Sequence, residues 1–183
     1  APVVAPPRPQ RRPLAAIRFA GEDIDSFVAG LIAELRPQGW RLSGVVQSRG
    51  RADPECHCAD MDLTSIATGE VFRISQPLGN GSHGCRLHPG ALAQCAAALD
   101  RELDASPDLL LLNRFGRGES EGRGFRDLIA RALDLGIPVL TAVQPTYAEA
   151  WAAFGGELAC DMPMDFQAVL AWAQSQREAR NAA

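Results

Sequence analysis

Residues 109–124 read LLLLNRFGRGESEGRG and contain the strongest strand signal in the chain, followed directly by a glycine-rich loop. Four consecutive leucines are apolar on both faces, which is typical of a central strand in a parallel sheet. In open α/β sheets, ligands bind beyond the carboxyl ends of the strands. The stretch therefore predicts a parallel α/β sheet and a binding loop that begins at Asn113 and Arg114.

Strand and helix signals alternate on both sides of this stretch. The predicted strands are residues 14–20, 40–48 and 137–143, with a short edge strand at 158–160, and the predicted helices are residues 24–35, 89–103, 125–135, 147–154 and a last helix capped by Asp165. Two β-like runs, 61–66 and 70–75, flank a turn at 67–69 and indicate a hairpin. We therefore expect an α/β fold: a mostly parallel sheet with helices on both faces and a β-hairpin inserted after the second strand.

The length of 183 residues is that of one domain. Residues 1–13 contain five prolines and three arginines without apolar periodicity, and we expect them to form an extended arm or linker. Residues 14–180 are expected to form a single domain. With 46% hydrophobic and 22% charged residues, the composition suggests neither disorder nor a membrane span.

All 18 basic residues are arginines, and the chain contains no lysine. The absence of lysine excludes a Walker A phosphate loop in its usual form, and it excludes Schiff-base chemistry. A net charge of −4 argues against a nucleic-acid surface, because the four arginines within residues 1–18 leave the remaining chain more acidic still. Five cysteines, an odd number, and no secretory signal at the start of the chain indicate a reduced, cytoplasmic protein.

Three acids, Glu22, Asp23 and Asp25, lie at the start of the first predicted helix. A phosphate-binding protein would carry glycines and a lysine there. The acids suit helix capping, and two other interpretations stay open: the acids hold a cation or a cationic ligand, or the helix start receives a nucleotide phosphate.

Asn113 and Arg114 follow the central strand, where a Walker B strand carries the aspartate that orders magnesium. Arginine repels a metal ion and offers a planar fork of donors to an oxyanion. We therefore predict an anion site formed by Asn113, Arg114 and Arg123, together with Ser48 and Arg49 after the second strand. The alternative is a solvated, charged loop.

A set of cysteines and histidines flanks the predicted hairpin, with the sequence CHC at residues 56–58 and Cys85 three residues before His88. Thiolate and imidazole groups are suitable zinc ligands, although this spacing is an incomplete zinc pattern. Three interpretations remain: a zinc site of Cys58, Cys85 and His88; thiols, Cys58 and Cys85 among them, that contact the ligand or take part in redox chemistry; or packed, inert cysteines.

The stretches CADMDLTSIATGEVFRISQPLGNGSHGCRLHPGAL and LLLLNRFGRGESEGRGFRDLIARALDLGIPVLTAV resemble an uncharacterised bacterial domain family whose members are often encoded beside molybdate transport genes. The resemblance covers most of residues 14–172. It implies a fold like that of the thermophilic nucleoside-triphosphatase branch of the P-loop proteins. The turn at 68–70 and the helix opening at Phe125 match that branch. By contrast, residues 21–26 lack the Walker A glycines and lysine, and Asn113 and Arg114 replace the Walker B acids, which implies a lost or rebuilt nucleotide site.

Three hypotheses for function follow. The leading one is a non-hydrolytic ligand-binding accessory protein for molybdate or another oxyanion in molybdenum metabolism. The partner would be a small anionic ligand, with a homo-oligomer or a molybdenum-pathway protein as a further partner, and neither nucleic acid nor membrane insertion is expected. The second is a divergent nucleoside triphosphatase or phosphotransferase, and the third is a regulatory module stabilised by zinc.

Overall fold

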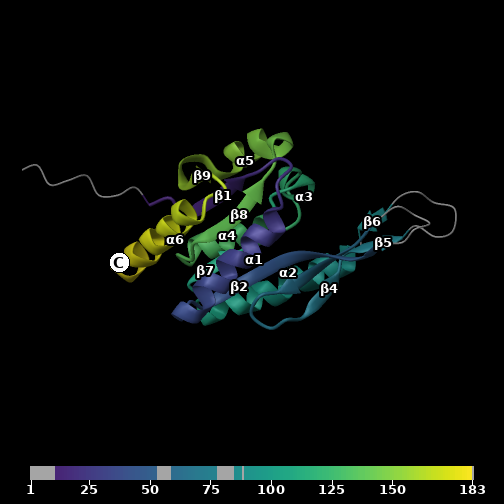
Figure 1. Ribbon diagram of the computed structural model, residues 1–183, viewed down its shortest axis with the longest axis horizontal. Helices are drawn as coiled ribbons and strands as arrows, with labels where there is room; N and C mark the ends of the chain where they lie inside the picture. Colours follow the sequence, from purple (N-terminus) through teal and green to yellow (C-terminus); the bar gives the residue numbers. More distant parts are fainter. Residues whose placement is uncertain (1–10, 53–58, 78–84, 88, 183) are drawn as a thin grey trace, which may run out of the picture.

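A seven-stranded sheet forms the centre of the part of the chain that the structure describes (Figure 1). The computed structural model describes residues 11–52, 59–77, 85–87 and 89–182. The strand order is β4-β3-β2-β7-β8-β1-β9, and β2, β7, β8, β1 and β9 are parallel to one another. Strand β3 pairs antiparallel with both β2 and β4. The predicted α/β fold with a mostly parallel sheet is confirmed.

The predicted strands and helices occur in the predicted order, and β5, β6 and the short helix α3 are present in addition. The strands are β1 (Leu14–Arg18), β2 (Leu42–Ala52), β3 (Ala59–Ser65), β4 (Val71–Arg73), β5 (Ser75–Pro77), β6 (Cys85–Leu87), β7 (Leu109–Leu111), β8 (Val139–Val143) and β9 (Ala159–Met162). The helices are α1 (Ile24–Leu35), α2 (Pro89–Glu102), α3 (Arg117–Ser120), α4 (Arg126–Asp134), α5 (Ala148–Gly155) and α6 (Phe166–Asn181). In the described ranges, no helix has the length and apolar character needed to cross a membrane.

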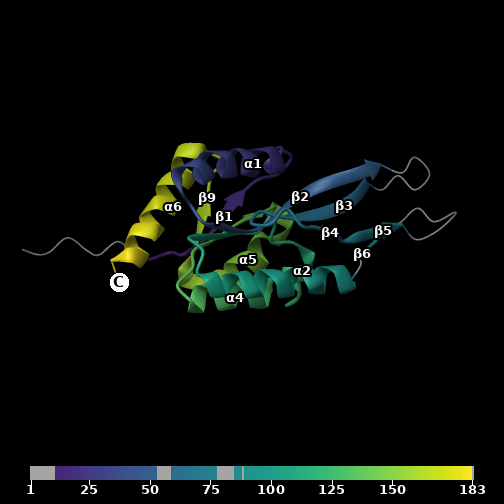
Figure 2. The same ribbon diagram turned by 90° about the horizontal axis from the view of Figure 1, so that it is seen from below.

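Helices cover both faces of the sheet, as Figure 2 shows, because the strands are apolar on both sides. Along β1, Leu14 and Ala16 belong to the core on one face, whereas Ala15 and Ile17 belong to the core on the other. Helices α2, α4 and α5 pack on the first face, and α1 and α6 pack on the second. The alternation follows from the two-residue period of a strand.

The predicted hairpin is present as β3 and β4, but it extends the main sheet because β3 also pairs with β2. This pairing lengthens β2 well beyond its predicted end. Ser48 and Arg49 were predicted at the carboxyl end of the second strand, and instead they lie within β2, in register with Asp62 and Met61 of β3. A separate two-stranded sheet of β5 and β6 was not predicted.

Candidate functional site

The loops after β1, β7 and β8 meet at one cavity of about 330 Å³. Phe19 follows β1, Asn113 and Arg114 follow β7, and Gln144 follows β8. Gln47 of β2, Arg117 and Glu119 add to the polar part of the wall. Most of the remaining wall is apolar, with Leu63, Ile74, Leu92, Phe115, Phe125 and Tyr147 among its side chains. The cavity therefore lies where ligands bind in open α/β sheets, beyond the carboxyl ends of the strands.

The loop between β1 and α1 is held by its own carboxylates. Glu22 Oε2 accepts a hydrogen bond of 2.6 Å from the Ala20 N–H. This bond has the largest effect in lowering the pKa of the Glu22 carboxyl, and a bond from the N–H of Glu22 itself has a smaller one. Asp23 caps α1 by accepting from the Ser26 N–H at 3.1 Å and from the Ser26 hydroxyl at 2.7 Å. One N–H group of the first helical turn, that of Ser26, and one in the loop before the helix, that of Ala20, therefore already donate to carboxylates, which leaves them unavailable to a phosphate.

Among the described residues, Arg114 is one of two arginines that line the cavity, the other being Arg117. Arg114 Nη2 lies 3.2 Å from Asp25 Oδ2, and its guanidinium carbon lies 5.5 Å from the centroid of the Phe19 ring. Its Nε is buried and donates to no partner among the described residues. A buried N–H without an acceptor costs free energy, so this atom is a donor available to a ligand.

Two amide side chains connect the strand ends. The buried Asn113 donates from Nδ2 to Gln47 Oε1 at 2.7 Å, and Gln144 donates from Nε2 to the Ala20 carbonyl at 3.3 Å. These contacts link β7 to β2 and the end of β8 to the loop after β1. They hold the polar rim of the cavity in place without adding charge to it.

Glu119 organises the loop that follows Arg114. Its side chain is buried, and its carboxylate accepts from the Gly116 N–H at 3.1 Å and from the Phe125 N–H at 3.2 Å. Gly124 has a φ of +65°, and a Cβ at this position would lie 2.6 Å from Glu119 Oε1. The loop thus closes around one carboxylate, and the glycine is required for that close approach.

The two other arginines of this loop interact with Glu121. Arg117 Nε lies 3.1 Å from Glu121 Oε1, and Arg123 also bonds to this carboxylate. The two hydrogen bonds lower the pKa of Glu121, and the bond from Arg117 has the larger effect. Arg117 lines the cavity, but Arg123, whose side chain is 73% exposed, is absent from the described lining.

The structure thus brings Asn113 and Arg114 together and leaves Arg123 on the surface. Ser48 and Arg49 lie in β2, and Cys85 begins β6. Cys58 and His88 lie outside the described residues, so the predicted zinc set and the predicted role of these thiols stay predictions. Among the residues that are described, no three His, Cys, Asp or Glu side chains form a group that could hold a metal ion.

Several residues of the site were not predicted from the sequence: Phe19, Gln47, Glu119 and Tyr147. For Glu119 the sequence carried only half of a capping-box signal: a glutamate stands three residues after Gly116 and accepts its N–H, but the glycine has no side chain to complete the box. For Gln47 no local signal existed, because its partner Asn113 is 66 residues away in the sequence.

Comparison with known proteins gives matches in both sequence and structure. The "Molybdenum import ATP-binding protein ModC 2" of Bradyrhizobium diazoefficiens is 34% identical over 160 residues, which is 87% of this chain and 18% of the length of that protein. A solution structure of a human cancer-related nucleoside triphosphatase superposes with a TM-score of 0.66 at 13% identity, covering 91% of this chain and 98% of the other. The crystal structure of THEP1 from the hyperthermophile Aquifex aeolicus gives a TM-score of 0.55 at 12% identity, covering 88% and 95%.

These structural matches show the fold of P-loop nucleoside triphosphatases, as the resemblance in the sequence implied. The family model of DUF2478, described as a protein of unknown function, matches residues 14–172. The chain belongs to the DUF2478 family.

Proposed function

We propose that the cavity beyond β1, β7 and β8 binds a small oxyanion, without nucleotide hydrolysis, as an accessory step in molybdenum metabolism. The observation that carries the proposal is Arg114. This arginine lines the cavity, and its buried Nε has no acceptor among the described residues. An oxyanion supplies such an acceptor, together with negative charge that complements the guanidinium.

The absence of hydrolysis rests on the loop before α1. Glu22 and Asp23 occupy the N–H groups of Ala20 and Ser26, so a triphosphate at the helix start would meet carboxylates in place of free donors. Asn113 follows β7, and its amide bonds to Gln47. A neutral amide lacks the negative charge with which an acidic residue orders magnesium.

The link to molybdenum rests on the relative named as a molybdenum import ATP-binding protein, of which this chain matches a part. Molybdate and tungstate are tetrahedral oxyanions, and sulfate has the same shape and charge. Titration calorimetry of the full chain with each of the three tests the proposal. We expect saturable heat, and Arg114→Gln should weaken binding by about tenfold or more, since hydrogen bonds to charged groups contribute about 1.5–3 kcal/mol.

Arg101→Gln is the matched control, because Arg101 is exposed on α2 and absent from the described lining of this cavity. Asp25→Asn should act in the opposite direction to Arg114→Gln. It removes the carboxylate that competes for Arg114, whose ion pair with Asp25 is about one third exposed. We therefore expect anion affinity to rise about two- to fivefold. Folded protein that gives no heat with any of the three anions would overturn the proposal.

The second candidate is a divergent nucleoside triphosphatase, and the shared fold is the observation that favours it. Its test is phosphate release from ATP or GTP in the presence of magnesium. A rate that is abolished by Arg114→Gln and retained by Arg101→Gln would assign hydrolysis to this cavity and replace the first proposal.

A further inference from the structure

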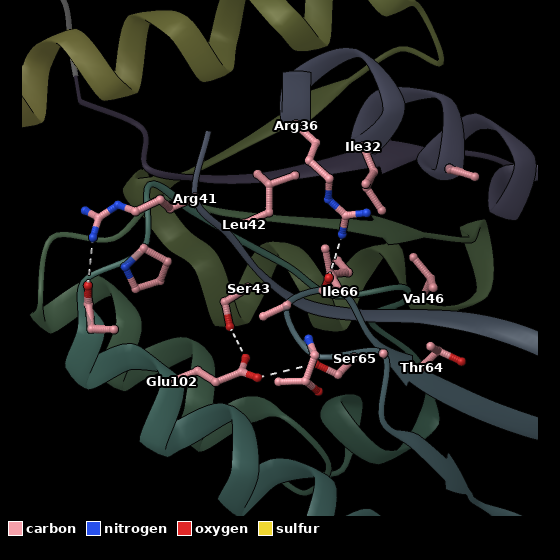
Figure 3. A pocket seen from close by; sticks show the side chains of 16 residues that line it. Ile32, Arg36, Arg41, Leu42, Ser43, Val46, Thr64, Ser65, Ile66 and Glu102 are labelled. Atoms are coloured by element: carbon pink, nitrogen blue, oxygen red, sulfur yellow. Dashed lines mark hydrogen bonds between the residues drawn. The ribbon is translucent and has the colours of Figure 1, made fainter. Parts of the chain in front are cut away.

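A second and larger cavity, of about 800 Å³, lies near the beginning of β2 and β7, away from the strand ends that form the candidate site (Figure 3). Its wall is built by the end of α1 with Arg36, by β2 with Leu42 and Ser43, by β3 with the turn after it, and by the end of α2 with Glu102. The polar and charged side chains of this wall therefore come from segments that are far apart in the sequence.

The floor of this cavity is a carboxylate held by two hydroxyl groups. Ser43 and Ser65 are buried, and both donate to Glu102, Ser65 at 3.3 Å to Oε1 and Ser43 to Oε2. Ser65 Oγ also accepts from the Thr68 N–H at 3.2 Å. Because each hydroxyl hydrogen is used on Glu102, the floor can only accept hydrogen bonds from a ligand, and within the described residues Glu102 forms no ion pair.

The rim carries two arginines whose charges are not neutralised. Arg36 Nη2 donates to the Ile66 carbonyl at 2.6 Å, and Arg41 donates to the carbonyls of Ala105 and Ser106 at 3.1 and 2.8 Å. Arg36 and Arg41 are both exposed residues. In the part of the chain that the structure describes, neither arginine forms an ion pair. Their partners are neutral carbonyls, so the guanidiniums are fixed in position and keep their positive charge.

We infer that this cavity binds a small organic zwitterion, with an ammonium group on Glu102 and an oxyanion group near Arg36 and Arg41. The hydrocarbon part of the ligand lies against Ile32, Val46 and Ile66. The charge pattern selects this class. A ligand with only an anionic group would place like charge toward Glu102, a ligand with only a cationic group would meet two guanidiniums at the rim, and an uncharged hydrocarbon would leave both kinds of charge unmatched.

The test uses three four-carbon probes that differ in their charged end groups: γ-aminobutyrate carries an ammonium and a carboxylate, butylamine only the ammonium, and butyrate only the carboxylate. Binding to the full chain is followed by amide chemical shifts, with the shifts expected at Ser43, Ser65 and Glu102. We expect saturable binding of γ-aminobutyrate, weaker binding of butylamine and no saturable binding of butyrate. Glu102→Gln should weaken the binding of γ-aminobutyrate by about tenfold or more, because it removes a charge-assisted hydrogen bond.

Glu149→Gln makes the same chemical change at an exposed position on α5 and should leave binding unchanged. Arg36→Gln changes an exposed residue. It should weaken the binding of γ-aminobutyrate and leave the binding of butylamine unchanged or tighter. Arg114→Gln distinguishes binding at the two cavities, since it should weaken the binding of molybdate and leave the binding of γ-aminobutyrate unchanged. No saturable binding of γ-aminobutyrate, or equal binding of butyrate, overturns the inference, as does γ-aminobutyrate binding that survives Glu102→Gln in folded protein.

Discussion

Cys95 lies on the buried face of α2 with 0% of its surface exposed. Burial first, and then the negative charges of Glu102 and Glu70, raise the pKa of its thiol from 9.0 to about 12. The thiolate is the reactive form of cysteine, so Cys95 should behave as a small apolar core residue.

The raised pKa of the Cys95 thiol predicts that the stability of the protein depends on pH in the alkaline range. In the unfolded chain the thiol loses its proton near pH 9.0, whereas in the folded protein it keeps the proton to about pH 12. The unfolded state therefore binds fewer protons between these values, and the free energy of unfolding, fully retained below pH 9.0, should fall as the pH rises through this window. Urea unfolding at a series of pH values measures it.

Cys95→Ala is the comparison for this measurement. The variant has lower stability at neutral pH, because it removes a buried sulfur atom, but the part of the alkaline loss that belongs to Cys95 should be absent. Parallel pH curves for the wild type and the variant would show that the thiol does not contribute.

At the scale of elements, the loop from Gly116 to Phe125 depends on one buried carboxylate. Glu119 accepts the N–H groups at both ends of this loop, and Gly124 approaches the carboxylate so closely that no Cβ fits. Helix α3 and the start of α4 are therefore positioned by the same side chain, next to the cavity that Arg114 lines.

Gly124→Ala should lower the free energy of unfolding by about 3 kcal/mol, because it combines a strained positive φ with displacement of Glu119 from two N–H groups. Gly136→Ala is a matched control: its φ is +75°, but no atom lies within 4 Å of the added Cβ. We expect about 1 kcal/mol for this control. Urea unfolding measures both, and equal losses would contradict the role given to Glu119.

At the scale of the whole molecule, β2 is the strand where the sheet changes direction. It pairs in parallel with β7 through Leu42–Gly44 and antiparallel with β3 from Val45 onward. Gly44 has a φ of +128°, and a Cβ there would lie 1.8 Å from the Leu111 carbonyl oxygen. The junction between the two halves of the sheet therefore has no space for a side chain.

Gly44→Ala should prevent the parallel pairing of β2 with β7 and so destabilise the whole sheet, by about 4 kcal/mol or more. Thermal unfolding followed by circular dichroism should show a much lower midpoint or no cooperative transition. Gly21→Ala serves as the control, because the added Cβ has no neighbour within 4 Å. A Gly44→Ala protein with an unchanged midpoint would show that the backbones can move apart at little cost.

The sequence by itself determined the order of the main strands and helices, although not β5, β6 or α3. It also determined the burial of the LLLL strand and the position of Asn113 and Arg114 at a strand end. These features depend on apolar periodicity, glycine and proline positions, and a rule about strand ends, all of which can be read within a short window. The family resemblance and the missing lysine also predicted a lost or rebuilt nucleotide site, and this stays a prediction. What the structure shows there is that carboxylates accept the N–H groups of Ala20 and Ser26.

The tertiary structure decided what depends on partners distant in the sequence. Only pairing with β3 extends β2 through Ser48 and Arg49, and only the sheet brings Gln47 to Asn113. The orientation of Arg123 toward Glu121, in place of the cavity, and the closure of the loop around Glu119 follow from side-chain contacts that no periodicity contains. The second cavity exists because Ser43, Ser65 and Glu102, on three separate elements, share hydrogen bonds that form only when the chain is folded.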